Sequence, residues 1–286
     1  MLIEGAMRRF RRARLHYGHG TDNARDEAAF LVLHALGLPL DAGAEVLAQP
    51  LPVAAVAAAE SLINARIQRR CPAAYLTHRM WFAGHEFYID ERVLVPRSPL
   101  AELIEGQFAP WIAPARVRHI LDIGTGSGCI ALATALAFPA ARVDATDISA
   151  DALAVAADNR ARHGLDARVT LHQADLFPPS ATRYDLIVSN PPYVPAARLD
   201  ELPAEYRAEP PLALISGVDG FDCVTAILAG AATRLSDDGI LVVEVGEIWP
   251  AVDRRFSTLP LTWIEFAAGG EGVFVISRRD LLEAAA

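Results

Sequence analysis

The run Asn190-Pro191-Pro192-Tyr193 places an amide, two prolines and an aromatic ring one residue after the apolar segment 184–188. The segment is short and β-branched near its end, which is typical of a buried strand. Two consecutive prolines remove two backbone donors and fix φ, and the asparagine is kept out of the α region by the proline after it. The pattern predicts a stiff corner with little freedom to move. Asn-Pro dipeptides often mark plain turns, so the surroundings decide whether this one is a site.

A glycine-rich loop follows a second apolar segment. The loop is Gly124-Thr125-Gly126-Ser127-Gly128, and a helical pattern begins directly after it. Strand, glycine loop and helix is the arrangement that lets backbone approach a ligand closely at a helix N-terminus. The loop alone does not choose the ligand. Gly126, Gly128 and Ala131 also satisfy the dinucleotide pattern with alanine in third place, so a nicotinamide-dependent dehydrogenase is an alternative.

Three aspartates follow or end three successive predicted strands. Asp147, with Ile148 after it, is placed to accept hydrogen bonds from two ribose hydroxyls, because a carboxylate accepts with both oxygens. Asp175 and Leu176 would flank an adenine, and Asp122 would face a cationic part of the ligand. Each acid alone would be interpreted as a cap or turn residue, but their joint placement predicts a nucleoside site. S-adenosylmethionine, a nucleoside with a cationic sulfonium, suits it.

Strands and helices alternate from residue 117 onward, which predicts an α/β fold with a Rossmann-like, doubly wound and mostly parallel sheet. Strands are expected at 118–123, 142–147, 169–173, 184–189 and 239–245. Segments 261–266 and 273–276, joined through glycines, predict a C-terminal antiparallel hairpin instead of a second mononucleotide half. The carboxyl ends of the parallel strands meet at one edge, where open α/β sheets bind ligands.

The N-terminal part has a different character. Residues 1–78 are expected to form a small helical domain, with Asp22 or Asn23 capping one helix and Pro52 starting another. Residues 79–96 are expected to form a β-hairpin connector. Its strands would be 81–89 and 93–95, with a turn at 90–92. Ser98 is placed to cap the next helix, with Pro99 at its first position. The larger domain would span 97–286.

Composition limits the classes of function. A chain of 286 residues with 52% hydrophobic content is typical of a globular protein with a full core. No apolar run reaches the length of a membrane span, and no signal peptide is recognisable, so the cytoplasm is expected. Three cysteines without a CxxC pair suggest neither disulfides nor a metal site. The net charge of −9 argues against DNA binding and favours a basic partner.

Together, the glycine loop and the Asn-Pro-Pro-Tyr run resemble those of the class I S-adenosylmethionine-dependent protein-glutamine N5-methyltransferases, over nearly the whole chain. The resemblance implies that Asn190, Pro191, Pro192 and Tyr193 bind a glutamine amide and carry the methyl transfer, and that Asn190 also borders the cofactor. It also implies that the helical N-terminal domain recognises a protein substrate. The chain begins later than the family pattern, so a shortened first helix is expected.

Several stretches resemble the branch that modifies large-subunit ribosomal protein L-three, a basic partner that would link the enzyme to ribosome biogenesis. They are residues 17–23, 81–88, 95–99 and 202–210. The branch that modifies peptide release factors carries a Pro-Arg-Pro-Asp/Glu-Thr-like run where this chain has Pro96-Arg97-Ser98-Pro99-Leu100. Release-factor modification remains an alternative. So do an adenine amino-methyltransferase acting on nucleic acid and a non-enzymatic assembly factor.

The chemistry implied is the transfer of a methyl group to a poor nucleophile. Asn190 Oδ1 and the Pro191 carbonyl would each accept one amide hydrogen, and Tyr193 would supply a wall for the substrate. Arg97 is expected to contact the substrate backbone or the cofactor carboxylate, unless it pairs with an acid such as Glu102 or Asp90. Glu244 and Glu247, after the fifth strand, are further carboxylates at the same sheet edge.

Overall fold

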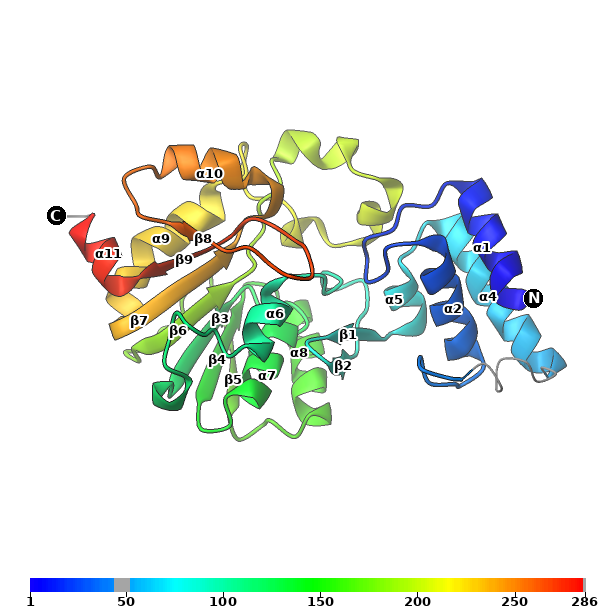
Figure 1. Cartoon of the computed structure of the whole chain (residues 1–286), viewed down its shortest axis with the longest axis horizontal. Coiled ribbons are helices and arrows are strands. Elements are labelled where there is room, and N and C mark those ends of the chain that lie inside the picture. Colours follow the sequence, from blue (N-terminus) through cyan, green and yellow to red (C-terminus); the bar gives the residue numbers. More distant parts are fainter. Residues whose placement is uncertain (44–51, 285–286) are drawn as a thin grey trace.

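The computed structural model describes residues 1–43 and 52–284, and its centre is a seven-stranded sheet (Figure 1). The strand order is β5-β4-β3-β6-β7-β9-β8. The first five of these strands are parallel, and β9 runs antiparallel to both β7 and β8. The predicted Rossmann-like sheet with a C-terminal hairpin is confirmed. The strands are β3 His119–Ile123, β4 Arg142–Asp147, β5 Val169–Gln173, β6 Tyr184–Ser189, β7 Leu235–Glu244, β8 Thr262–Trp263 and β9 Val273–Ser277.

Helices cover both faces of the sheet. One buried cluster contains residues of α6 (Leu100–Glu105), α7 (Cys129–Ala137) and α8 (Ala150–Arg162). The opposite cluster contains residues of α9 (Asp222–Arg234), α10 (Trp249–Arg255) and α11 (Arg278–Glu283). Leu186 and Val188 of β6 belong to the first cluster and Ile187 to the second, as the alternation of a strand requires. Burial on both faces explains why residues 186–188 of this strand form a continuous apolar run.

The N-terminal helices lie at the opposite end of the molecule from the C-terminus (Figure 1). They are α1 Leu2–Ala13, α2 Ala24–Ala35, α4 Val53–Arg69 and α5 Ala73–Thr77. Asn23 caps α2 by accepting hydrogen bonds from the backbone of Arg25 and Asp26. These helices bury their own cluster, which includes Phe10, Leu31 and Ile63. None of the helices in the described residues is both long enough and apolar enough to span a bilayer.

The connector hairpin is present, but its expected strands are wrong. β1 (Met80–Phe82) pairs with β2 (His85–Phe87), so both strands lie largely within the segment expected to be one strand. Ala83 and Gly84 form the turn with φ of 46° and 74°, as a two-residue type I′ turn requires. Val93–Val95 forms no strand, because side chains satisfy its backbone. The Tyr75 hydroxyl donates to the Val93 carbonyl, and the Val95 N–H donates to Glu209.

A bridging segment, residues 194–215, follows the Asn-Pro-Pro-Tyr corner. It contains three short 3₁₀ turns, η2 Ala196–Glu201, η3 Ala204–Ala208 and η4 Pro211–Ala213. Elsewhere in the described residues lie two more 3₁₀ turns, η1 Pro114–Arg116 and η5 Gly246–Ile248. Figure 1 shows the bridging segment in yellow-green between α10 and the N-terminal helices. It therefore connects the sheet edge with the helical end of the molecule.

Candidate active site

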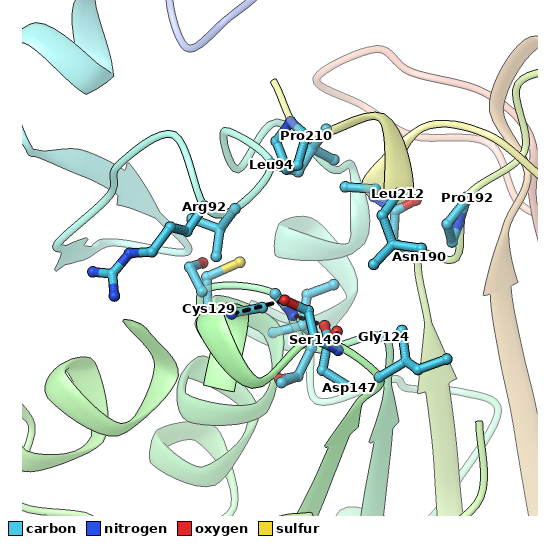
Figure 2. A pocket seen from close by; sticks show the side chains of 18 of the residues that line it. Arg92, Leu94, Gly124, Cys129, Asp147, Ser149, Asn190, Pro192, Pro210 and Leu212 are labelled. Atoms are coloured by element: carbon cyan, nitrogen blue, oxygen red, sulfur yellow. Dashed lines mark hydrogen bonds between the residues drawn. The ribbon is translucent and has the colours of Figure 1, made fainter. Parts of the chain in front are cut away.

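A cavity of about 240 Å³ opens at the carboxyl ends of β3, β4, β5 and β6. Figure 2 shows Asn190 and Leu212 on one side, Arg92 and Cys129 on the other, and Asp147 and Ser149 close to Gly124. Eleven of the predicted site residues line it. They are Arg97, Gly124, Thr125, Gly126, Ser127, Asp147, Ile148, Asp175, Leu176, Asn190 and Pro192. The cavity therefore brings the corner and most of the predicted nucleoside site together.

Asp147 is held at the cavity by two backbone donors. Its Oδ2 accepts from the Gly126 N–H at 2.9 Å, and its Oδ1 accepts from the Ser149 N–H at 2.9 Å. Burial raises the pKa of the carboxyl, and these backbone hydrogen bonds oppose the rise. Each oxygen keeps further lone pairs, so the group can accept hydrogen bonds from a ligand.

The first two glycines of the loop leave open space in front of the backbone. Gly124 and Gly126 have φ of 72° and 54°, and a Cβ added at either would meet no heavy atom within 4 Å. Since both line the cavity, a side chain there would enter the space available to a ligand. Gly128 does not line the cavity. A Cβ on it would lie 3.2 Å from the Ala156 Cβ, so this glycine permits close packing of α7 against α8.

Asp122 lies behind the cavity wall. It is fully buried, and its Oδ2 accepts from Thr125 Oγ1 at 2.6 Å and from the Ala131 N–H at 3.1 Å. Burial raises the pKa of this carboxyl to about 7. The expectation that Asp122 faces a ligand is therefore not met. It fixes the glycine loop and the start of α7 from below.

Asn190 and Pro192 present the corner to the cavity, and Asn190 is half-buried. Pro191 is buried outside the cavity lining. Tyr193 also lies outside the lining and packs on Gly246, where an added Cβ would come within 2.7 Å of the ring. Burial raises the pKa of Tyr193 above its usual value. The corner is held to the neighbouring strand by the Ser189 hydroxyl, which donates to the Ile123 carbonyl at 2.8 Å.

Arg97 lines the cavity but pairs with an acid that the sequence did not suggest. Its Nη1 and Nη2 donate to Glu209 Oε1 and Oε2 at 2.6 and 2.9 Å. Burial disfavours ionisation of Glu209, but the hydrogen bonds from Arg97 and the nearby His19 ring, whose Nε2 lies 3.4 Å from Oε2, outweigh it and lower the pKa to about 2. The two acids that were expected as alternative partners of Arg97 are paired elsewhere. Asp90 pairs with Arg92, and Glu102 accepts from the backbone of Ala267 and Ala268.

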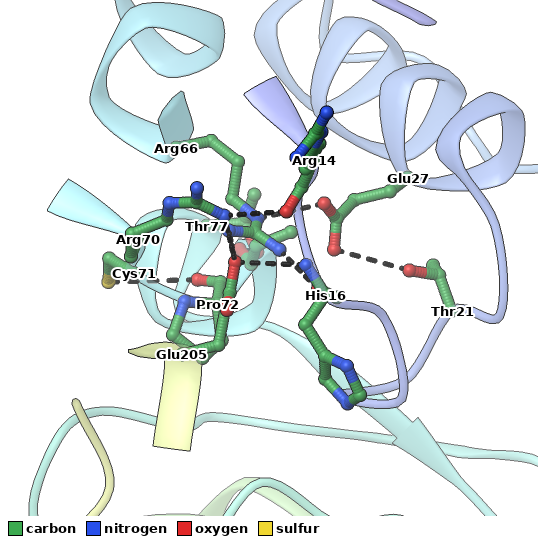
Figure 3. A network of polar contacts seen from close by, with 11 residues as sticks. Arg14, His16, Thr21, Glu27, Arg66, Arg70, Cys71, Pro72, Thr77 and Glu205 are labelled. Atoms are coloured by element: carbon green, nitrogen blue, oxygen red, sulfur yellow. Dashed lines mark hydrogen bonds and ion pairs between the residues drawn. The ribbon is translucent and has the colours of Figure 1, made fainter. Parts of the chain in front are cut away.

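A second buried acid ties the bridging segment to the N-terminal helices. Glu205 Oε1 accepts from Arg66 at 3.2 Å, from Arg70 at 3.1 Å and from the His16 N–H at 3.1 Å (Figure 3). Arg66 is fully buried and also donates to Glu27 of α2 at 2.8 Å. Glu205 and Glu209 are four residues apart, so one short stretch carries both anchors.

The two carboxylates expected after the fifth strand have different surroundings. Glu244 ends β7 and is 6% exposed, and the Ser98 hydroxyl donates to its Oε2. Ser98 itself lines the cavity and accepts from the Leu100 N–H at 3.1 Å, so it supports the start of α6 as predicted, although α6 begins one residue later than expected. Burial raises the pKa of Glu244 to about 7. Glu247 instead pairs with Arg198 at the surface, at 2.8 Å.

Sequence reasoning missed most of the wall that faces the glycine loop. Pro210, Leu212, Ala213 and Ile215 of the bridging segment line the cavity. Their position shortly after the corner in the chain was the one available signal. Cys129 and Ile130 were also missed, although residues that open the helix after a glycine loop are expected at a ligand. Four more lining residues belong to the connector, whose position relative to the sheet cannot be predicted from a local sequence pattern. They are Arg92, Val93, Leu94 and Pro96.

Comparison with known proteins places these features in a family. Residues 108–202 match the family model "Methyltransferase small domain". The ribosomal protein uL3 glutamine methyltransferase of Burkholderia pseudomallei is 48% identical, over 98% of this chain and 94% of that protein. The enzyme of the same name from Bordetella pertussis is 47% identical, over 98% and 95%.

Among solved structures, the hMettl16 catalytic domain in complex with MAT2A 3′UTR hairpin 6 superposes with a TM-score of 0.51. It is 16% identical and the match covers 77% of this chain and 79% of that one, so this likeness concerns the fold alone. The curated relatives extend across almost the whole sequence. The chain is therefore a methyltransferase that belongs to the ribosomal protein uL3 glutamine methyltransferase family.

Proposed function

We propose that this protein transfers a methyl group from S-adenosylmethionine to the side-chain amide nitrogen, N5, of a glutamine in ribosomal protein uL3. The observation that carries the proposal is the shared cavity, which is lined by Asn190, by Asp147 and by Gly124 and Gly126. An amide-binding corner and a nucleoside-binding edge then face one space. The names of the curated relatives support uL3 as the substrate.

The residues present fit the cofactor. The open space in front of Gly124 and Gly126 admits a ligand close to the backbone, and Asp147 offers acceptors for ribose hydroxyls. Asp175, Ile148 and Leu176 line the same region and would hold the adenine. S-adenosylmethionine supplies an electrophilic methyl group on a cationic sulfonium when it is bound. Thr125 and Ser127 complete the loop, and Asp122 and Gly128 support it from outside the cavity.

The corner prepares the substrate nitrogen. A glutamine amide is a poor nucleophile because its nitrogen shares its lone pair with the carbonyl. Asn190 Oδ1 and the Pro191 carbonyl would accept the two N–H groups and hold the nitrogen in one orientation. Pro191 and Pro192 keep this corner rigid, and Tyr193 supports it through its packing on Gly246. Arg97, which lines the cavity and is fixed by Glu209, would contact the substrate backbone.

The wider molecule suits a basic protein substrate. The net charge of −9 favours encounter with a basic ribosomal protein in the cytoplasm over binding to DNA. We assign residues 1–78 to substrate recognition, 79–96 to the connector and 97–286 to methyl transfer. The separate hydrophobic cluster of the N-terminal helices supports this division.

The test is a methyl-transfer assay with four separate acceptors. Purified protein and isotope-labelled S-adenosylmethionine are incubated with uL3, with a peptide release factor, with DNA or with RNA. We expect label in uL3 alone, and mass spectrometry should place one methyl group on one glutamine. Label only in the release factor or in nucleic acid would reject the proposed substrate. A deletion strain should lack one methyl group on its uL3.

A further inference from the structure

Methylation of an amide nitrogen must dispose of a proton. The nitrogen lone pair forms the new N–C bond, the S–C bonding pair remains on sulfur, and the nitrogen keeps both hydrogens and becomes cationic. One of these protons must leave to give the neutral N-methyl amide. No imidazole in the described residues lines the cavity. The structure therefore has to offer another acceptor near Asn190.

Ser98 and Glu244 form a hydrogen-bonded path that starts at the cavity. Ser98 lines the cavity, and its hydroxyl donates to Glu244 Oε2. It accepts the Leu100 N–H with one lone pair, at 3.1 Å, so its second lone pair remains for a donor inside the cavity. A proton that reaches Ser98 can therefore be exchanged for the one that Ser98 passes to Glu244.

Strand register places Glu244 beside the corner. β6 and β7 are parallel neighbours, with Val188 opposite Val242 and Ser189 opposite Val243. The next positions are Asn190 and Glu244, on strands about 4.8 Å apart. Val188 and Val242 lie in the same buried cluster. Because side chains alternate along a strand, the positions of Asn190 and Glu244, each two residues later, are on the same face of the sheet as Val188 and Val242.

We propose that Ser98 and Glu244 take up the proton that the glutamine amide loses. The proton moves from the substrate nitrogen to Ser98 Oγ as the Ser98 proton moves to Glu244 Oε2. Glu244 ends neutral, Ser98 is unchanged and the product is a neutral amide. In this scheme Ser98 is the residue that meets the substrate and Glu244 acts through it. The inference rests on the proposed function.

The surroundings of Glu244 suit a group that changes protonation near neutrality. Burial raises its pKa to about 7, while the Ser98 hydrogen bond and the nearby Arg97 guanidinium oppose the rise. Tyr193 also lies close to it, and the pKa of that phenol is raised, so it stays neutral. Glu244 accepts a proton only when it is ionised. The rate of the chemical step should therefore fall as the pH drops through about 7.

The experiment measures single-turnover methylation of uL3 across the neutral pH range. Glu244→Gln keeps an acceptor for the Ser98 hydroxyl but cannot take up the proton. We expect a rate roughly 100-fold below that of the unmodified enzyme at alkaline pH. We also expect the inflection near neutrality to disappear. Ser98→Ala should behave in the same way as Glu244→Gln. Ser98→Thr, which keeps a hydroxyl, should retain both the rate and the inflection of the enzyme without substitutions.

Glu247→Gln is the matched control, because Glu247 lies three residues away and pairs with Arg198 at the surface. It should leave the rate and its pH profile unchanged. Calorimetric titration with S-adenosylhomocysteine reports the fraction of folded, binding-competent protein for each variant. If the Glu244→Gln enzyme keeps the pH profile of the enzyme without substitutions, the inference is overturned, whatever its absolute rate of methylation. Absence of uL3 methylation by the unmodified enzyme would instead reject the proposed function.

Discussion

At the scale of single residues, Asn190 separates substrate handling from cofactor binding. Its side chain lines the cavity at the corner, and Asp147 lines it at another strand end. Asn190→Ala removes one acceptor for the glutamine amide but leaves Asp147 and the glycine loop intact. We expect methyl transfer to uL3 to fall at least ~100-fold while affinity for S-adenosylhomocysteine changes little. Rate assays and calorimetry measure the two quantities, and equal loss of both would move Asn190 to the cofactor side.

Gly126 allows a test of whether the cofactor occupies the open space in front of the glycine loop. Gly126→Ala places a methyl group in the open space in front of the loop. Because Gly126 has a left-handed backbone conformation, an alanine there also costs about 1 kcal/mol of stability. Gly164→Ala is the control, because Gly164 has a similar φ of 65°, an equally open Cβ position and no place in the cavity. Both variants should lose similar stability in urea unfolding. Only Gly126→Ala should weaken S-adenosylhomocysteine binding. Equal weakening by both variants would contradict a cofactor site in front of the glycine loop.

The sequence alone predicted that residues near the carboxyl ends of the strands gather at one edge, because all strands of a parallel sheet end at the same edge. Asp147 and Asn190 were placed at the cavity for this reason. It did not predict which side of the edge a residue occupies. Asp122 lies one residue before the end of its strand and does not line the cavity, and Gly128 serves helix packing. These outcomes depend on how α7 and α8 pack, which spacing in the sequence does not specify.

At the scale of elements, the bridging segment should act as a positioning element for the cavity. Glu209 is fully buried and joins Arg97 and the Val95 N–H directly before Pro210, which begins the cavity wall. Glu209→Gln places an amide N–H₂ against the guanidinium and should loosen the wall. We expect affinity for S-adenosylhomocysteine to fall about 10-fold, close to 1.4 kcal/mol. Amide hydrogen exchange within residues 204–215 should become faster.

Glu27→Gln is the matched control for Glu209→Gln, since Glu27 is equally buried and also pairs with an arginine, but lies in α2. It should lower stability without changing that affinity. The pKa of Glu209 is about 2 in the folded protein against a usual 4.5, so its stabilisation is present above pH 4.5 and lost as the pH falls towards 2. Both variants are therefore compared at neutral pH. Similar affinity losses in both would remove the positioning role.

The connector shows why some elements escaped the sequence pattern. Val93 and Val95 alternate with Leu94 as a strand would, and both are buried as that pattern predicts. Their backbone partners are a tyrosine hydroxyl 18 residues earlier and a carboxylate 114 residues later. A strand pattern reports burial and alternation, and the same signal arises where distant side chains replace a neighbouring strand. The nearby turn at Ala83-Gly84 was overlooked because alanine rarely adopts positive φ.

At the scale of the whole molecule, Arg66 links the N-terminal helices to the cavity end. It is fully buried and donates to Glu27, to Glu205 and to the His16 carbonyl. Arg66→Met retains most of the aliphatic stem but leaves two carboxylates without this partner. Removing one member of a buried ionic network costs about 3–5 kcal/mol, because the remaining charges stay desolvated. We expect a loss of that size in the free energy of unfolding, measured with urea at neutral pH.

Arg9→Met is the control for Arg66→Met. Arg9 pairs with Glu60 across α1 and α4 at 2.6 Å, but the two side chains are 38% and 43% exposed. An exposed pair contributes at most about 1 kcal/mol, so this variant should lose little. Adding Glu27→Gln and Glu205→Gln to Arg66→Met removes the stranded charges and should recover part of the lost stability. If Arg66→Met costs no more than Arg9→Met, the bridging segment is held to the N-terminal helices by apolar packing instead of by this network.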